Sequence, residues 1–348
     1  MPDVRSADEG ISQFEFTGRA GDYFRIWIVS LCLSLLTLGV YSAWGKVRKR
    51  RYLYAHTRVA GDGFDYRAPP LSILRGRVAA VVLFGGMALA GHFIPLLQVL
   101  LFVLFVVLLP WLVVASARFN ARNTAFRGIT FGFDGRLGEA AAVFIGIGVL
   151  VIVTFGVLYP YYRRKRAEFV VAHHRFGATQ FTADIPTSAF TVIYLMAFLM
   201  LMGTVVLSIV GVLGALALAG MSGRDEAPAA LSVLPMIAIY AVYLFIFAYI
   251  RAGTGNATLN GTLIGPIRLR SSLGAWSLAW LYLSNALAII ASLGLATAWA
   301  TVRMARYRAQ RLVLVTALPL ATLAGGADSS ANATGSEVSD LFDVDVSL

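Results

Sequence analysis

Charged residues are missing from long stretches of this chain. Only 14% of the 348 residues are Asp, Glu, Lys or Arg, whereas soluble globular chains average about 25%. A helix needs about 20 mostly apolar residues to cross the hydrocarbon core of a membrane. The absence of charge therefore excludes an ordinary soluble protein and predicts several membrane segments. The charge-free stretches are 26–45, 78–117, 140–162, 185–223, 227–250 and 271–302.

Residues that carry catalysis or bind metals are also scarce. The one cysteine, Cys32, excludes a disulfide within the chain and a thiolate metal site. The histidines show no HExxH spacing, and no Gly-rich phosphate loop precedes a Lys-Ser or Lys-Thr pair. The apolar segments contain no acidic residue, which disfavours a proton-coupled pump. We expect no catalytic residue, no metal and no cofactor, and a protein that is not an enzyme.

The charge that is present is mostly positive, with a formal net charge of +11. Cytoplasmic loops of membrane proteins carry excess Lys and Arg, and this excess sets their orientation. No aromatic-basic recognition module stands apart from the membrane-flanking segments, so we expect no nucleic-acid partner. The polar, acidic opening MPDVRSADEGIS is no secretory signal peptide, and the first apolar segment is expected to act as an uncleaved insertion signal.

The chain repeats itself at an offset of 117 residues. The segment FEFTG recurs as FGFDG, the pair Thr37 and Gly39 recurs as Thr154 and Gly156, and a partial third copy follows at an offset of 255. The predicted organisation is a polar N-terminus (1–12), two membrane repeats (13–128 and 129–261), a truncated third repeat (262–324) and a disordered acidic tail (325–348). The signature residues of the repeats are Gly39, Trp44, His56, Arg58, Gly156, Tyr161, His173, Arg175, Gly294 and Trp299.

Each complete repeat predicts the same series of elements. An alternating strand leads into an apolar segment that is broken at Thr-x-Gly, where glycine suits a helix that stops or bends. An aromatic-basic helix follows, then a strand around Phe64 or Phe181, and then an apolar hairpin. The predicted fold class is mainly α: a polytopic transmembrane helical bundle with internal repeats, broken or re-entrant helices and short cytoplasmic β elements.

Two topologies fit the first apolar segment of each repeat. If every segment crosses once, successive repeats are inverted, and the basic runs after Thr37 and Thr154 fall on opposite sides of the membrane. If the segment dips in and returns, its first arm, 24–37, is about 21 Å long, which is short of the ~30 Å core. Strands around Phe16 and Phe64 then share one side, and nearly all basic residues become cytoplasmic, as does the C-terminus.

Basic clusters next to aromatic residues predict an interface with lipid headgroups. Aromatic residues anchor at the membrane surface, and basic clusters beside a membrane attract anionic lipid at about 1 kcal/mol per charge. The alternative is that these clusters only set orientation. The residues are Lys46, Arg48, Lys49, Arg50, Arg51, Arg163, Arg164, Lys165, Arg166, Arg303 and Arg306. The expected partners are membrane lipids, with anionic lipids among them, and the oligomeric state is left open.

The segments FEFTG, TLGVYSAWGKVRKRRY and HTRVAGDGFDY resemble the YjgN-like family of bacterial inner-membrane proteins, which is defined as a domain of unknown function. The resemblance is close over 13–128, recognisable through the repeat over 129–261, and faint beyond. It implies a multi-pass protein of the bacterial inner membrane and implies no activity.

Two functions are compatible with these patterns. Repeats and broken helices favour a transport or channel-like protein, because such breaks line cavities at membrane depth in known transporters. The alternative is a non-catalytic lipid-binding or scaffold protein of the cell envelope. Transport predicts a polar cavity at the Thr-x-Gly breaks, whereas a scaffold predicts a dry bundle.

Overall fold

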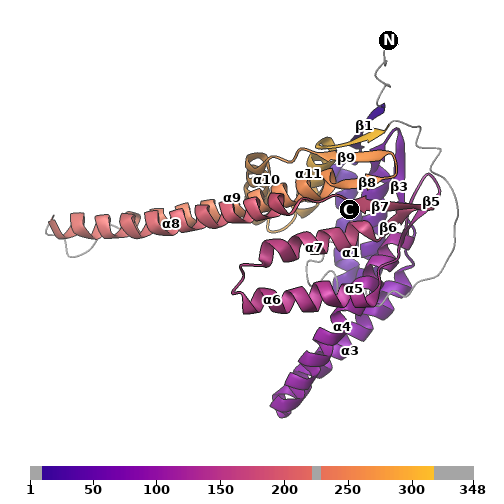
Figure 1. The fold of residues 1–348 in the computed structure, drawn as a ribbon, viewed down its shortest axis with the longest axis horizontal. Coiled ribbons are helices and arrows are strands. Elements are labelled where there is room, and N and C mark those ends of the chain that lie inside the picture. Colours follow the sequence, from indigo (N-terminus) through magenta and orange to yellow (C-terminus); the bar gives the residue numbers. More distant parts are fainter. Residues whose placement is uncertain (1–9, 222–228, 317–348) are drawn as a thin grey trace, which may run out of the picture. The chain divides into compact units, whose positions relative to one another are not determined.

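Ten short strands form a closed antiparallel barrel in the computed structural model, which describes residues 10–221 and 229–316 (Figure 1). The predicted fold class, a polytopic helical bundle, is therefore wrong: helices are abundant, but they connect the strands of a barrel. The strands are β1 (Gly10–Phe16), β2 (Thr57–Val59), β3 (Asp62–Tyr66), β4 (Thr124–Phe126), β5 (Ile129–Phe133), β6 (His174–Phe176), β7 (Thr179–Ala183), β8 (Thr262–Ile264), β9 (Ile267–Ser271) and β10 (Leu312–Thr316).

The strands follow one another around the barrel in chain order. Each strand pairs with its neighbours in sequence, and β1 pairs with β10 from Gly10 opposite Thr316 to Gln13 opposite Val313, which closes the ring. Antiparallel order places alternate connections at opposite ends of the barrel. The connections β2–β3, β4–β5, β6–β7 and β8–β9 are two-residue turns at one end, and the described chain begins and ends there too.

The two-residue turns have the backbone that tight hairpins require. Ala60–Gly61 and Arg127–Gly128 have consecutive positive φ angles, as type I′ turns do, while Gly177 and Gly265 have a positive φ at the first turn position. These turns match the right-handed twist of the flanking strands. They also allow strands of only three residues to pair in a fixed register.

Every connection at the opposite end of the barrel contains helices. The helices of the first four of these connections are α1 (Ala20–Leu36), α2 (Ser42–His56), α3 (Pro70–Phe93), α4 (Pro95–Arg122), α5 (Leu137–Ala141), the π-helical turn η1 (Ala142–Ile147), α6 (Gly148–Val153), α7 (Tyr159–Ala172), α8 (Thr187–Met221) and α9 (Ala229–Asn260). The last connection contains α10 (Ala275–Ala291) and α11 (Thr297–Gln310).

The interior of the barrel is filled with apolar side chains. Phe64 lies 4.8 Å from Phe126, and Phe131 lies 5.0 Å from Phe176, measured between ring centroids. The rings of Phe14 and Phe181 extend this aromatic group, and Ile267, Leu269 and Leu314 pack in the same cluster. Burial of a large apolar side chain stabilises a fold by about 1.5–3 kcal/mol. The barrel is thus a packed core.

Side chains from the returning helices bind the barrel wall one strand beyond the strand that each helix leads into. The second helical arm of each connection donates a hydrogen bond to a backbone carbonyl at or just beyond the end of the second strand that follows it, one strand further around the barrel than the strand that the arm itself leads into. The final arm donates to the end of β1, so the pattern continues around the closed ring. The bonds are Arg51 Nε to Tyr66 O (3.4 Å), Arg118 Nε to Phe133 O (3.4 Å), Arg164 Nε to Ile185 O (3.0 Å), Asn260 Nδ2 to Ser271 O (3.3 Å) and Arg306 Nη2 to Gly18 O (3.1 Å).

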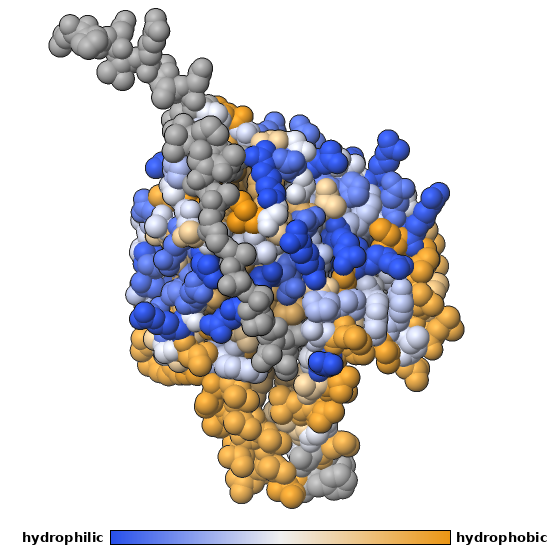
Figure 2. All heavy atoms as spheres, turned by 90° about the vertical axis from the view of Figure 1, so that its right-hand side faces the viewer, coloured by the Kyte–Doolittle hydropathy of each residue, from blue (hydrophilic) through white to orange (hydrophobic). Residues whose placement is uncertain are grey.

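The described helices include three that are long and apolar enough to cross a membrane. They are Pro70–Leu89, Leu96–Arg122 and Thr187–Gly214, while Leu137–Val153 and Ala275–Ala291 are shorter apolar stretches. Figure 2 shows hydrophobic residues covering the projecting α3 and α4, and hydrophilic residues gathered over the barrel. Among the described residues, the long membrane crossings are therefore fewer than the sequence predicted.

The chain divides into two compact units. One unit consists of Pro186–Ala257 and Ser272–Thr297, and the other contains the barrel, α1 to α7 and α11. The boundaries at residues 128, 261 and 324 follow the sequence offsets and stay predictions. The polar segment 1–12 lies mostly outside the described residues, and the acidic tail 325–348 lies wholly outside them.

Candidate membrane interface

The Thr-x-Gly breaks form three turns with the same backbone conformation. Leu38, Phe155 and Leu293 have φ angles of 49°, 50° and 50°, and the glycines that follow have φ angles of 93°, 89° and 94°. A left-handed conformation costs a residue with a Cβ atom about 1–2 kcal/mol, which explains why glycine occupies the second position. The predicted helix breaks are confirmed, and each one turns the chain back to form a short helical hairpin.

The hydroxyl group before each glycine stabilises the turn. Thr37 Oγ1 donates to Leu33 O at 2.7 Å and accepts from Tyr41 N at 2.9 Å. Thr154 makes the matching bonds, and Ser292 takes this place in the third turn, accepting from Ala296 N at 2.8 Å. A side-chain oxygen here gives the chain an alternative to helix hydrogen bonding. The geometry of the turn thus explains both the threonine and the glycine of the Thr-x-Gly pattern.

The most exposed side chains at these turns are hydrophobic. Leu38 is 96% exposed, Phe155 is 97% exposed and Leu293 is 95% exposed. The glycine beside each has open space around it, with no atom within 4 Å of an added Cβ. The exposed groups at these turns are apolar, whereas the sequence predicted a polar cavity at Thr-x-Gly for a transporter. Large exposed apolar groups mark a site of interaction with a partner or a membrane.

The first basic cluster lies on α2, directly after the first turn. Arg50 Nη1 donates to Asn120 Oδ1 at 2.9 Å, and its guanidinium lies 5.5 Å from the Tyr66 ring centroid. Burial lowers the pKa of Lys49, and the positive charges of Arg77 and Lys46 lower it further. Arg48 and Arg51 are exposed. The cluster thus divides into Arg50 and Arg51, which bind Asn120 and the carbonyl of Tyr66, and cations such as Arg48 and Lys49, whose charged form a nearby anion would stabilise.

The second basic cluster, on α7, is compensated within the chain. Glu168 accepts ion pairs from Arg164 at 3.3 Å and from Lys165 at 3.1 Å. Burial lowers the pKa of Arg166, whose guanidinium lies over the rings of Phe144 and Tyr162. Arg163 is half-buried. Arg164, Lys165 and Arg166, predicted as headgroup ligands, therefore also make ion pairs and ring contacts within the chain.

The third basic cluster, on α11, is sparser. The Arg303 guanidinium lies 5.1 Å from the ring centroid of Trp299, which is 42% exposed. Arg306 is exposed and donates to the end of β1, as described above. Cation–π contacts of this kind recur on α7, where Lys165 lies 5.9 Å from the Tyr161 ring. In the first cluster, Trp44 stacks on Tyr41 at 6.2 Å. Aromatic and basic residues thus adjoin in all three clusters, as the sequence suggested.

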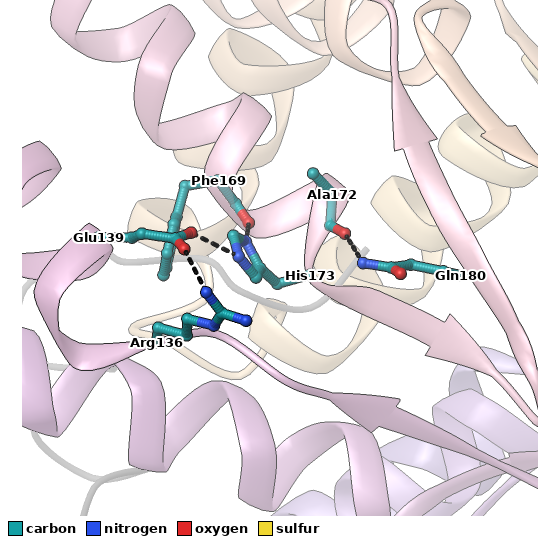
Figure 3. A network of polar contacts seen from close by, with 6 residues as sticks. All are labelled: Arg136, Glu139, Phe169, Ala172, His173 and Gln180. Carbon is teal, nitrogen blue, oxygen red and sulfur yellow. Dashed lines mark hydrogen bonds and ion pairs between the residues drawn. The ribbon is translucent and has the colours of Figure 1, made fainter.

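The histidines of the repeat signature lie at the junction of helix and barrel. His173 Nδ1 lies 2.8 Å from Phe169 O, and His173 Nε2 lies 2.8 Å from Glu139 Oε2 (Figure 3). A carbonyl oxygen only accepts, so Nδ1 is the donor in the contact with Phe169. The pair joins the start of α5 to the end of α7.

Glu139 was missed as a partner of His173 because 34 residues separate them and no short spacing connects them. The only signal was positional: Glu139 falls on Asp22 at the same offset that places His173 on His56. His56 Nδ1 lies 2.8 Å from Tyr52 O, and its ring stacks on Tyr52 at 4.1 Å. Both histidines therefore cap the last turn of a basic helix.

The signature arginines belong to the barrel wall. Arg58 lies on β2 opposite Glu15, and Arg175 on β6 pairs with Asp134 at 2.8 Å. Neither approaches a cluster of metal ligands, since the described residues contain no group of three His, Cys, Asp or Glu side chains able to hold a metal ion.

Comparison with known proteins identifies relatives that are described as inner membrane proteins. The inner membrane protein YjgN of Salmonella typhimurium is 28% identical over 156 residues, and that of Escherichia coli K12 is 27% identical over 162 residues. These matches cover 44% and 45% of this chain but only 40% and 39% of the relatives' own lengths. No solved structure matches the chain. Residues 11–341 match the family described as bacterial protein of unknown function (DUF898), and the chain belongs to this family.

Proposed function

We propose that this protein is a non-catalytic, membrane-anchored platform that holds anionic lipid at the surface from which its barrel projects. Its relatives are inner-membrane proteins, and three described helices have the length and composition to cross a membrane. The observation that carries the proposal is the order of groups along each short hairpin. An exposed apolar turn comes first, aromatic residues follow, and basic residues come next.

That order matches the layers of a membrane surface. Hydrocarbon lies deepest, aromatic rings favour the interface, and cations favour the phosphate layer. On α2 the order runs from Leu38 through Tyr41 and Trp44 to Lys46 and Arg48. Burial and like charge disfavour the charged form of Lys49, and a lipid phosphate beside it would relieve that penalty.

A transport function has less support from the same residues. The barrel interior is occupied by Phe64, Phe126, Phe131 and Phe176 in mutual contact. The glycines of the Thr-x-Gly turns face open space. A route for a solute through the barrel would require this aromatic core to separate, at the cost of its buried area.

The test compares two charge-matched variants in nanodiscs of mixed phosphatidylcholine and phosphatidylglycerol. Arg48→Gln with Lys49→Gln removes two cations from α2, and Arg268→Gln with Arg270→Gln removes two from exposed positions of β9. We expect the α2 variant to lose most of its preference for phosphatidylglycerol, at about 1 kcal/mol or fivefold per charge. The loss is largest at low salt, because salt screens exposed charges.

The measurement is the ratio of the two lipids retained on the protein, determined by native mass spectrometry. The β9 variant serves as the control and keeps the wild-type ratio. Equal ratios in the wild-type protein and the α2 variant would show that the cluster only sets orientation.

A further inference from the structure

The three short helical hairpins have features that a hairpin surrounded by water would not need. Each begins at the barrel, reverses at a Thr-x-Gly or Ser-x-Gly turn and returns to the barrel. Exposure of apolar groups rises toward each turn: Leu35 is 70% exposed and Leu36 is 80% exposed before Leu38. In the second hairpin Ile152 and Val157 are 76% and 78% exposed on either side of Phe155. Each turn thus ends in an apolar tip.

The backbone donors at each tip are already paired within the turn. In the first, Leu38 N donates to Leu35 O at 3.2 Å, and Gly39 N donates to Ser34 O at 2.7 Å. The next two donors bind Thr37, through its carbonyl and its hydroxyl. The other two turns repeat these bonds, with Gly156 N to Val151 O and Gly294 N to Ile289 O both at 2.8 Å. Such pairing is a condition for placing irregular backbone in hydrocarbon, where no water replaces a missing partner.

The distance from each tip to the next cation sets the depth that the tip can reach. Lys46 lies eight residues after Leu38, and Arg163 lies eight residues after Phe155. At 1.5 Å per helical residue this is about 12 Å. Arg303 lies ten residues after Leu293, which is about 15 Å. The hydrocarbon core is ~30 Å thick, so one leaflet contributes ~15 Å. All three distances match one leaflet and none approaches two.

The arms that lead to the tips are compatible with the same depth. Arg25 lies thirteen residues before Leu38, about 20 Å along a helix, which is too short to cross the core. The first arm of the third hairpin contains Trp276 and Trp280, which are 75% and 60% exposed near its start. Exposed tryptophans favour the headgroup level of a membrane, so this arm also begins at the interface.

We propose that each hairpin inserts into one leaflet alone and stops near the bilayer midplane. The occupant of the apolar tips is the acyl-chain layer of that leaflet, and the cations that follow lie at its phosphates. Burial of a leucine or phenylalanine side chain is worth about 1.5–3 kcal/mol, so Leu38, Phe155 and Leu293 each contribute to anchoring. The inference goes beyond the proposed function, because tip insertion requires no preference for anionic headgroups.

The test uses single cysteines in a Cys32→Ala background, which removes the only native thiol. Leu38→Cys, Phe155→Cys and Leu293→Cys place a thiol at each tip, and Gln180→Cys on β7 places one on the exposed surface of the barrel. The proteins are reconstituted in vesicles and treated with a membrane-impermeant maleimide from each side in turn. In a second measurement, a fluorophore on each cysteine is quenched by lipids brominated at shallow or deep acyl positions.

We expect the Gln180→Cys protein to react from one side and the three tip cysteines to react from neither. The fluorophore at each tip is quenched more strongly by deep than by shallow bromines. Labelling of a tip from the side opposite to the Gln180→Cys protein would show a full crossing. Labelling from the same side, or preferential quenching by shallow bromines, would place that hairpin outside the hydrocarbon. Either result overturns the proposal for that hairpin and leaves the lipid-preference test of α2 unaffected.

Discussion

The second Thr-x-Gly turn allows a comparison in which two similar substitutions have opposite effects. Gly156 has a φ of 89°, whereas Gly148 begins α6 with φ −57° and ψ −43°. Both have open space where a Cβ would lie, so packing does not distinguish them. Gly156→Ala forces alanine into a left-handed conformation and costs about 1–2 kcal/mol. Gly148→Ala removes a flexible glycine from a helix and gains roughly 0.5–1 kcal/mol.

The expected difference between the two variants is therefore about 1.5–3 kcal/mol. Reversible unfolding in detergent micelles, followed by tryptophan fluorescence, measures the free energy of unfolding of each variant. Gly156→Asn is an internal check, because asparagine tolerates the left-handed region better than alanine does, and its cost falls between those of glycine and alanine. If Gly156→Ala were as stable as the wild-type protein, or if both alanine variants shifted the same way, backbone strain at the turn would be refuted.

Three further predictions follow from the barrel and its junction with the helices. Burial lowers the pKa of His174 below 6.5. As the pH falls below about 6.5, the unfolded chain therefore takes up a proton at this histidine before the folded protein does, and the free energy of unfolding decreases. A His174→Phe variant should lose this pH dependence in denaturant titrations at several pH values. A double-mutant cycle with Glu139→Gln and His173→Gln should give a coupling of about 0.5–1 kcal/mol, as expected for a partly exposed pair, and a value near zero would remove the pair as a link. Reporter fusions at the two termini should report the same side of the membrane, since β1 and β10 pair at the end of the barrel away from the helices; opposite sides would contradict the closed ring.

The sequence predicted local elements better than their assembly. The alternating FEFTG and FGFDG segments contain the ends of β1 and β5, and the strands around Phe64 and Phe181 are β3 and β7. Strands around Phe16 and Phe64 were expected to share one side, and they share a barrel with β2 between them. Strands β2, β4, β6 and β8 have three residues each, too few to show a period-two pattern. Because these four short strands could not be predicted, a closed sheet could not be inferred from the sequence.

The candidate site was predictable where its chemistry is local. Apolar turns, aromatic residues and cations follow one another along α2, α7 and α11, and their order can be read directly from the sequence. The compensation of Arg164 and Lys165 by Glu168 depends on helical spacing and was open to prediction in principle. The contact of Glu139 with His173, and of Arg50 with Asn120, depends on how distant helices pack. No rule of spacing predicts such contacts.

The pairing of β1 with β10 delays closure of the barrel until late in synthesis. The first strand emerges from the ribosome some 300 residues before its partner, and domains assemble as the chain grows. The hydrophobic helices of the earlier connections are available for insertion throughout this interval, while β1 still has one unpaired edge. The barrel therefore closes only after β10 has been synthesised. A message truncated before Leu312 would leave β1 and β9 as open edges, which are sites for aggregation.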